Sequence, residues 1–329
     1  MEQRELGKSG LKIAPLVFGT NVLGWTVDER TSFDLLDRFV DAGLNAIDTA
    51  DVYSVWADGH QGGESEAIIG KWMKARGNRD RIMLATKVGM DMGGGRTGLK
   101  ASYIAEEVET SLRRLQTDYI DLYFAHQDDL EVPLEETLDA FARLVEQGKV
   151  RVIGASNYEA PRLSEALAVS ADKGLPRYDV LQPHYNLYDR MAYEVALEEV
   201  AVEHGLGVVT YFSLAKGFLT GKYRSEADLS QSVRGSGMAA NLEARGQRIL
   251  AVLDEVAAET RSSPAQVSLA WLMARPSVTA PIASATSIAQ IDELIGAVEL
   301  KLGADAIERL DHASMPKLLE ESEKILVNE

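Results

Sequence analysis

Short runs of apolar residues alternate along the chain with longer stretches in which apolar residues recur at helical spacing and charged residues fill the outer face. The short runs have strand length and are apolar on both faces, which is typical of a buried parallel sheet. Several helical stretches begin at capping residues, such as Thr31, Ser102 and the pair Ser263-Pro264. The pattern predicts strands near 16–20, 46–50, 82–87, 120–126, 150–156, 180–186, 206–212 and 278–284, and helices near 31–42, 64–76, 101–116, 134–147, 160–173, 193–204, 264–275 and 288–297.

This alternation predicts an α/β fold. The crossovers are short and no change of composition divides the chain, so we expect the eight strand–helix units to close into a (β/α)8 TIM barrel. We expect residues 1–329 to form this single domain, with a short hairpin-like lead around Lys8-Ser9-Gly10 and an extra C-terminal helix within 306–326. The longest irregular stretches, 88–100 and 213–240, follow strands and should overhang the end of the barrel where active sites form.

The chain is strongly acidic, with 51 acidic and 34 basic residues and a formal net charge of −17. This charge repels a phosphate backbone and an anionic bilayer, so we expect neither nucleic acid nor a membrane as partner. The absence of cysteine excludes disulfides and thiolate zinc sites, and the five histidines are too scattered to predict a metal site. No apolar run approaches the ~20 residues that span a bilayer, and the amino terminus lacks the apolar stretch of a secretory signal, so we expect a cytoplasmic protein.

Polar residues stand at the carboxyl ends of three successive predicted strands, where the side chains of a barrel converge. Asp48, Lys87 and His126 end the second, third and fourth strands, and Tyr53 lies in the loop after Asp48. A phenol, with an ordinary pKa of about 10, is a poor proton donor at neutral pH unless a nearby cation stabilises its phenolate. Lys87 can supply that cation, Asp48 can hold the ammonium in place, and a neutral His126 can hydrogen-bond a substrate oxygen. Each residue alone also fits a structural role, as part of an internal ion pair, a packed ring or a core histidine.

Longer motifs surround these residues and continue along the chain. They are LGKSGLKIAPLVFGT, GLNAIDTADVYS, GGESEAIIGKWM, LATKVG, LYFAHQDDLEVPLEETLDAFARLVEQGKVRVIGASNY, LQPHYNLYDR and FLTGKY. Together they resemble the aldo-keto reductase family over nearly the whole chain. The resemblance implies a nicotinamide cofactor extended across the barrel mouth and hydride transfer to the carbonyl of an aldehyde or ketone. It also implies a catalytic tetrad of Asp48, Tyr53, Lys87 and His126, in which Tyr53 is the general acid.

The resemblance assigns further residues to each part of the cofactor and to the substrate. The chain from Leu214 to Leu219 would present backbone N–H groups to the pyrophosphate, and Gly217 would let the chain approach it closely. The other cofactor residues that it implies are Gly19, Thr20 and Asp48 beneath the nicotinamide ribose; Ser156, Asn157 and Gln182 at the carboxamide; Tyr211 stacked on the nicotinamide ring; and Ser284, Thr286 and Gln290 at the adenosine end. The rim residues expected to contact substrate are Asn21, Trp25, Trp56, Met90 and Gln127.

One departure from the family concerns the 2′-phosphate that distinguishes NADP(H) from NAD(H). Many relatives carry Lys or Arg after the eighth strand, whereas this chain has the uncharged run Ser284-Ala285-Thr286-Ser287, then Gln290 and Leu294. The charge that would favour NADP(H) is therefore weak at this point. Hydroxyl and amide groups can still hydrogen-bond a phosphate, and Lys216, Lys222 or Arg234 could reach it. Family habit favours NADP(H), and NAD(H) stays open.

Two other functions remain open. One is an NAD(P)-dependent dehydrogenase that oxidises a sugar or polyol. The other is a non-catalytic cofactor-sensing subunit, because the family includes channel-associated β subunits; an intact tetrad with His126 argues against it. We expect a small carbonyl or alcohol substrate, no metal, and a monomer or weak homo-oligomer.

A glycine motif favours a different fold at first sight. Gly93 to Gly98 satisfies G-x-G-x-x-G and precedes a helix, as in a dinucleotide-binding Rossmann fold. In that fold the first glycine directly follows a strand, whereas Gly93 comes six residues after Lys87. The motif therefore predicts a flexible loop at the barrel rim.

Overall fold

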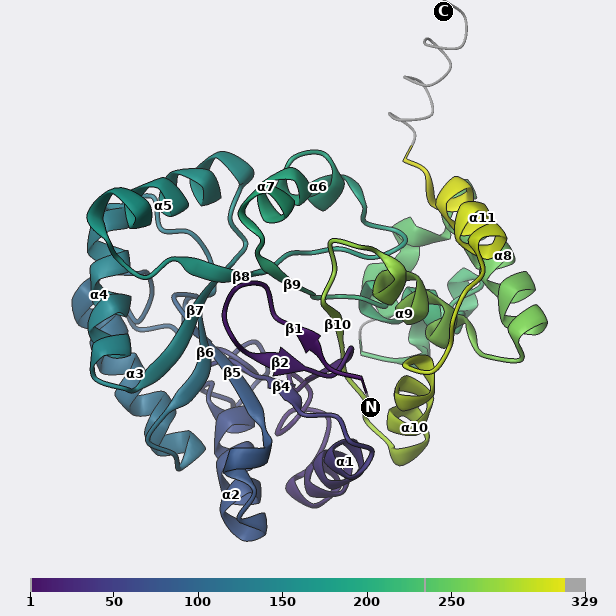
Figure 1. The fold of residues 1–329 in the computed structure, drawn as a ribbon. Coiled ribbons are helices and arrows are strands. Elements are labelled where there is room, and N and C mark those ends of the chain that lie inside the picture. Colours follow the sequence, from purple (N-terminus) through teal and green to yellow (C-terminus); the bar gives the residue numbers. More distant parts are fainter. Residues whose placement is uncertain (1, 234, 317–329) are drawn as a thin grey trace, which may run out of the picture.

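Eight parallel strands close into a barrel, which confirms the predicted (β/α)8 TIM fold (Figure 1). The computed structural model describes residues 2–233 and 235–316. The last strand of the chain closes the ring by pairing in parallel with the first barrel strand. The barrel strands are β3 (Val17–Gly19), β4 (Ala46–Asp48), β5 (Met83–Val88), β6 (Ile120–Ala125), β7 (Val150–Ser156), β8 (Tyr178–Gln182), β9 (Gly207–Thr210) and β10 (Ala280–Ala283).

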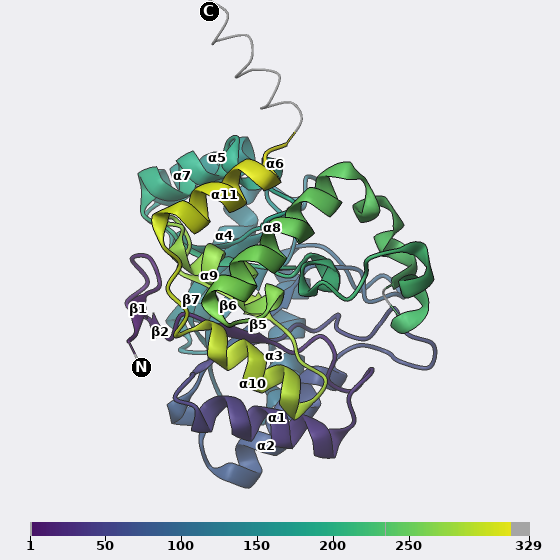
Figure 2. The ribbon, with the colours of Figure 1, turned by 90° about the vertical axis from the view of Figure 1, so that its right-hand side faces the viewer.

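Helices cover the outside of the barrel (Figures 1 and 2). Most of them match the predicted ranges to within two residues. They are α1 (Glu29–Asp41), α2 (Glu64–Arg76), α3 (Ala101–Leu115), α4 (Leu134–Glu146), α5 (Ala160–Lys173), α6 (Met191–Glu194), α7 (Leu197–His204), α8 (Ala244–Thr260), α9 (Pro264–Ala274) and α10 (Ile288–Ala297).

The helices differ from the prediction in two places. The single helix predicted over 193–204 is two helices, α6 and α7, because the backbone leaves helical geometry at Ala196, where φ is −145°. Helix α8 was not predicted, although Ile249, Leu253 and Val256 repeat at helical spacing and are buried. It was missed because one helix was assigned to each strand, whereas the connection from β9 to β10 holds both α8 and α9.

The predicted helix caps are right at one position and displaced at two. Ser263 caps α9, since its side chain accepts a hydrogen bond from the Gln266 backbone N–H. Helix α1 begins earlier than predicted, with Asp28 as its cap and Thr31 as the donor to that carboxylate. Helix α3 follows Lys100, and its start has no side-chain cap.

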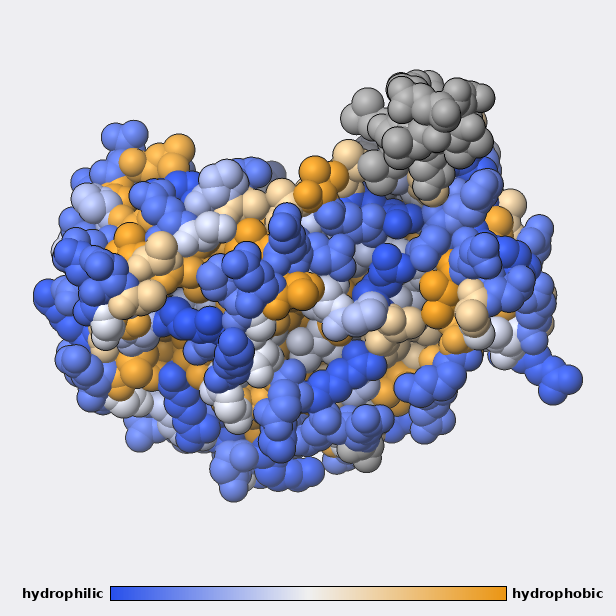
Figure 3. Space-filling view, turned by 45° about the horizontal axis from the view of Figure 1, so that its top comes forward, coloured by the Kyte–Doolittle hydropathy of each residue, from blue (hydrophilic) through white to orange (hydrophobic). Residues whose placement is uncertain are grey.

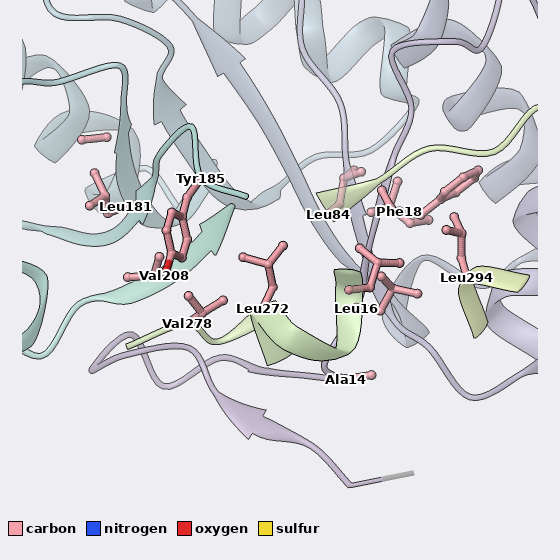
Figure 4. Close-up of a cluster of buried hydrophobic side chains, with 14 of the residues drawn as sticks. Ala14, Leu16, Phe18, Leu84, Leu181, Tyr185, Val208, Leu272, Val278 and Leu294 are labelled. Atoms are coloured by element: carbon pink, nitrogen blue, oxygen red, sulfur yellow. The ribbon is translucent and has the colours of Figure 1, made fainter. Parts of the chain in front are cut away.

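Alternation along the strands separates two layers of the core. In β6, Leu122 and Phe124 belong to the cluster inside the barrel, whereas Tyr123 belongs to the cluster between barrel and helices. Figure 4 shows part of the outer cluster, where Leu181 and Val208 from neighbouring strands lie near side chains of the surrounding segments. Because β6 is buried on both faces, it is mostly apolar, as the sequence pattern indicated, and Asp121 is its one charged residue.

The chain outside the barrel includes a hairpin and a final helix, both as predicted. Strands β1 (Arg4–Glu5) and β2 (Lys12–Ile13) pair antiparallel, and Ile13 joins the cluster inside the barrel (Figure 1). Helix α11 (Ala304–Ser314) packs beside α8 (Figure 2). The part of the predicted segment 306–326 beyond residue 316 lies outside the described residues.

The face shown in Figure 3 is largely hydrophilic, with apolar areas between the hydrophilic residues. Among the described residues, no helix is both long enough and apolar enough to span a membrane.

We expect Gly154→Ala, inside the barrel, to destabilise the fold by about 1–3 kcal/mol. A β-carbon at Gly154 would lie 2.5 Å from the Phe124 ring and 2.9 Å from the Val180 carbonyl oxygen. Urea unfolding measures the change, and Gly237→Ala, which meets no described atom within 4 Å, is the control. Equal stability of the two variants would contradict the close packing of the barrel interior.

Candidate active site

The buried ammonium group of Lys87 contacts two of the other predicted catalytic residues, Asp48 and Tyr53, at the carboxyl end of the barrel. Lys87 is fully buried, and its Nζ donates to Asp48 Oδ2 at 2.8 Å, to the Thr49 carbonyl oxygen at 2.7 Å and to the Tyr53 hydroxyl at 2.8 Å. An ammonium has three hydrogens, so these contacts use all of them. Because the Tyr53 oxygen accepts from Lys87, its own hydrogen is directed elsewhere; Asp48 Oδ2 lies 3.2 Å away.

Strand register explains why these residues meet. Gly19, Asp48 and Ala85 lie side by side on β3, β4 and β5; β3 and β4 end there, whereas β5 continues to Val88. Lys87 follows Ala85 by two residues and therefore faces the barrel interior as Ala85 does. The loop after β4 then turns back over this end, with Ser54 in the left-handed region at φ 80°.

Burial and charge set the ionisation of the lysine and the histidine. Burial lowers the pKa of Lys87, and the charge and hydrogen bond of Asp48 oppose that effect. Burial, together with the nearby positive charge of Lys87, holds the pKa of His126 well below its usual range. The imidazole is therefore neutral at neutral pH. Its Nδ1 is buried and has no hydrogen-bond partner among the described residues, and its ring centroid lies 6.3 Å from that of Tyr53.

A cavity of about 970 Å³ opens beside this cluster and brings most of the predicted site residues together. Loop 213–240 lines much of it, as expected, whereas loop 88–100 contributes Met90 alone. The predicted residues that line the cavity are Gly19, Asn21, Trp25, Asp48, Tyr53, Met90, His126, Ser156, Asn157, Gln182, Tyr211, Leu214, Gly217, Ser284, Thr286 and Gln290.

Five predicted residues lie next to the cavity rather than in its lining. Thr20 and Lys87 are buried beneath it, where the Thr20 hydroxyl donates to the Asp48 carbonyl oxygen at 2.8 Å. Leu219 is also buried. Trp56 is half-exposed, and its ring meets the Trp25 ring edge to face at 5.5 Å. The Gln127 amide donates to the Gly89 carbonyl oxygen at 3.3 Å.

A row of amide and hydroxyl groups lines the cavity beside the tetrad. Gln182 Nε2 donates to Asp48 Oδ1 at 2.9 Å, and the Ser156 hydroxyl donates to the Gln182 carbonyl oxygen at 3.0 Å. Asn157 Nδ2 donates to the His126 carbonyl oxygen at 2.8 Å, and the Tyr211 hydroxyl donates to Asn157 Oδ1 at 2.7 Å. These bonds fix polar groups in the positions where a carboxamide can be bound.

The segment after β9 has an unusual backbone conformation beside the cavity. Ala215, Lys216 and Gly217 have φ values of 46°, 55° and 99°, a left-handed run that is costly for residues with a β-carbon. Backbone N–H groups in turns of this kind bind phosphate in many proteins. In this segment the N–H groups of Ala215, Gly217 and Leu219 donate to the carbonyl oxygens of Phe212 and Leu214. Lys222 also lines the cavity, and its ammonium lies 3.2 Å from the position of a β-carbon on Gly217. Because Gly217 has no β-carbon, an anionic group such as the pyrophosphate of a dinucleotide can approach this turn closely.

Some lining residues were not predicted as part of the site. Glu293 lies about one turn beyond Gln290 on α10, and helical spacing from Gln290 could have identified it; Leu294, named above with Gln290, lines the cavity beside it. Gln231 and Ser232 come from the long segment after β9, whose path the sequence does not show. Arg234, named above as a candidate cation, lies outside the described residues.

Metal ligands are not clustered here. Within residues 2–233 and 235–316, no group of three or more histidine or acidic side chains is placed to hold a metal ion.

Comparison with known proteins gives one consistent family. The model of the Aldo/keto reductase family matches residues 15–314. The "Uncharacterized oxidoreductase YrpG" of Bacillus subtilis is 35% identical over 94% of this chain and 95% of its own length. The "Aldo-keto reductase YhdN" of the same organism is 37% identical over 69% of this chain and 66% of its own. A "Probable voltage-gated potassium channel subunit beta" of Arabidopsis thaliana is 32% identical over 91% of this chain and 92% of its own.

We expect His126 to stay uncharged in the folded protein from pH 8 down to pH 6. Its lowered pKa means that the folded chain does not take up the proton that an unfolded histidine binds near pH ~6.5, so this residue removes stability as pH falls below that value. NMR of the histidine ring protons measures the titration, and the resonance absent from His126→Asn gives the assignment. A midpoint near pH ~6.5 for that resonance would contradict the burial argument.

Proposed function

The chain belongs to the aldo/keto reductase family and is an NAD(P)-dependent oxidoreductase, and on that premise we propose that it reduces an aldehyde or ketone to the alcohol. The observation that carries the proposal is the contact of the buried Lys87 ammonium with the Tyr53 hydroxyl at 2.8 Å, beside an open cavity. A carbonyl that accepts a hydride also needs a proton at its oxygen, and this contact prepares a proton donor.

Tyr53 is the general acid in this proposal. Its oxygen accepts a hydrogen bond from Lys87, and a positive charge at that distance stabilises the phenolate left after the proton has gone. Asp48 holds the ammonium through Oδ2, while Gln182 holds Asp48 through Oδ1. The phenol therefore loses its proton to a carbonyl oxygen in the cavity without any rearrangement of the charges behind it.

His126 orients the carbonyl. A neutral imidazole carries one ring N–H, which can donate to the substrate oxygen beside Tyr53. An imidazolium next to Lys87 would place two cations in a buried site, and the lowered pKa of His126 prevents that. Two donors, the phenol and the imidazole, thus converge on one oxygen.

The cofactor in this proposal is a nicotinamide dinucleotide, which supplies the hydride when it is bound. Ser156, Asn157 and Gln182 would hold the carboxamide, and Tyr211 would stack on the nicotinamide ring. The left-handed run at Ala215 to Gly217 would hold the pyrophosphate. The remaining residues proposed for this role are Gly19, Thr20, Asp48, Leu214, Leu219, Ser284, Thr286 and Gln290.

The substrate in this proposal lies between the tetrad and the tryptophan pair. Trp25 meets Trp56 at 5.5 Å, and Trp56 meets Tyr53 at 6.1 Å, both edge to face. These rings favour a carbonyl compound with an apolar part. Asn21, Met90 and Gln127 complete the proposed substrate contacts.

A cofactor-sensing subunit is the rival function, because one of the relatives is named a channel subunit. The tetrad contacts favour turnover over sensing, since binding a cofactor does not require a buried lysine on a tyrosine hydroxyl. A panel of aldehydes, ketones, sugars and polyols, assayed in both directions by the absorbance of reduced nicotinamide, separates the two. Lack of turnover on the whole panel, with tight cofactor binding, would favour the sensor.

We expect Lys87→Met to lower turnover by about 10²–10⁴-fold, because the phenolate of Tyr53 loses its stabilising cation. Cofactor affinity should stay nearly unchanged, since Lys87 lies beneath the cavity and does not line it. Steady-state kinetics and fluorescence titration with NADPH measure the two quantities.

Tyr53→Phe is the matched variant, because it removes the acid and leaves the Lys87–Asp48 ion pair in place. It should lose activity to a similar extent while remaining folded by circular dichroism. Near-normal turnover in both variants would refute the role assigned to Tyr53.

Lys222 is the residue that we propose to favour NADP(H). It lines the same cavity as Thr286 and Gln290 and supplies a cation that the segment after β10 lacks. We expect Lys222→Gln to weaken NADPH binding by about tenfold with little effect on NADH, and Lys222→Arg to retain the preference. Calorimetric titration of the wild type and both variants with each cofactor measures the six affinities. An equal loss for both cofactors would place Lys222 at the pyrophosphate and remove the basis for a preference.

A further inference from the structure

Tyr211 is supported from behind by a histidine that the proposed reaction does not use. The backbone of His184 pairs with that of Tyr211 as a continuation of β8 and β9, which places the two side chains next to each other. Their rings are stacked, with centroids 5.2 Å apart and planes inclined by 17°. Tyr211 lines the cavity and His184 does not, so the imidazole covers the face of the phenol that is turned away from the cavity.

An aspartate fixes the histidine in this position. Asp189 Oδ2 lies 3.1 Å from His184 Nε2, and a carboxylate only accepts hydrogen bonds, so Nε2 carries a hydrogen. Burial raises the pKa of Asp189, but hydrogen bonds from His184 and Asn186 outweigh burial and hold the pKa below its usual range. The carboxylate is therefore charged at neutral pH. Arg245 is the other charged group that acts on it.

A buried amide connects this pair to the loop that follows Tyr211. Asn186 is fully buried, and its Nδ2 donates to Asp189 Oδ2 at 3.0 Å and to the Phe212 carbonyl oxygen at 3.0 Å. Phe212 has φ 52°, a left-handed conformation that is uncommon for a residue with a β-carbon. Asn186 and Asp189 thus hold both the histidine behind Tyr211 and the strained residue after it.

We propose that His184 and Asp189 form a positioning pair for the nicotinamide: the imidazole holds the Tyr211 ring in place, and the carboxylate favours the oxidised over the reduced cofactor. The proposal rests on the function proposed above, in which Tyr211 stacks on the nicotinamide ring. Neither residue touches the cofactor, and both act through Tyr211.

The preference for the oxidised over the reduced cofactor follows from the charge of the nicotinamide ring. The oxidised nicotinamide ring carries a positive charge and the reduced ring is neutral, so a negative charge behind Tyr211 stabilises only the oxidised form. The effect is modest, because the Asp189 side chain is 35% exposed and the positive charges of a protonated His184 and of Arg245 offset part of its charge. We expect a change of about threefold in the ratio of the two affinities. Hydride transfer to a carbonyl turns the neutral ring into the positively charged one, so the same charge favours carbonyl reduction on the enzyme, and tighter binding of the oxidised form slows its release afterwards.

Fluorescence titration of the full chain with NADP⁺ and NADPH tests both the role of the His184 ring and the role of the Asp189 charge. His184→Ala removes the ring behind Tyr211 and should weaken both cofactor forms by about three- to tenfold. His184→Phe restores a ring at this position and should bind both forms within about twofold of the wild type. Asp189→Asn keeps the shape, removes the charge, and should raise the ratio of the NADP⁺ to the NADPH dissociation constant about threefold.

The outcomes separate this inference from the proposed function. Unchanged affinities in His184→Ala, or an unchanged ratio in Asp189→Asn, would overturn the positioning pair while leaving carbonyl reduction in place. A merely structural role would weaken both forms equally in all three variants, without rescue by phenylalanine, and would also overturn it. Wild-type protein that binds neither form would overturn both proposals.

Discussion

A fully buried ammonium is the constraint on which the active site depends. Taking a cation out of water is costly unless an anion and hydrogen-bond acceptors replace the water. Lys87 meets this condition with one carboxylate, one carbonyl and one phenol, each within 2.8 Å. The Tyr53 hydroxyl is therefore one of the acceptors that stabilise the buried ammonium. The same contact gives Tyr53 the acid strength that the proposed reaction requires.

The barrel makes this arrangement possible because the carboxyl ends of all its parallel strands lie at one end of the barrel. Asp48 and Lys87 come from neighbouring strands whose register is fixed by apolar residues on both faces. The same geometry repeats at β7 and β8, where Ser156 and Gln182 are register partners at the strand ends. It continues past β8 and β9, where His184 pairs with Tyr211. Polar groups from distant parts of the chain are thus placed by strand pairing, and the loops add shape around them.

The barrel could be predicted from the sequence because burial of its strands on both faces leaves a recognisable apolar pattern. Strands buried on both faces are short, apolar and separated by amphipathic helices, so β5 and β6 lie within a residue or two of their predicted ranges. Helix α8 was missed although its apolar residues repeat at helical spacing, because the βα rhythm assigns one helix to each strand. The break between α6 and α7 occurs at Ala196, where no proline or glycine marks it.

The site residues were predicted partly from their positions at strand ends and partly from resemblance to the family. Positions at strand ends, such as Asp48 and Lys87, follow from the barrel alone, whereas residues such as Tyr211 and Gln290 came from resemblance to the family. Loop residues were harder, because Gln231 and Ser232 reach the cavity through turns that have no periodic pattern. The contact of His184 with Tyr211 depends on backbone pairing beyond the end of β8 and was not visible in the sequence.

The protonation state of Lys87 tests the central claim most directly. NMR of the ε-carbon and ζ-nitrogen in lysine-labelled protein, assigned with Lys87→Met, reports whether the buried amine is charged. The account predicts an ammonium at pH 7 that loses its proton at a lower pH than exposed lysines, and at a still lower pH in Asp48→Asn. A neutral amine at pH 7 in the wild type would contradict it, because Tyr53 would then have no cation beside its oxygen.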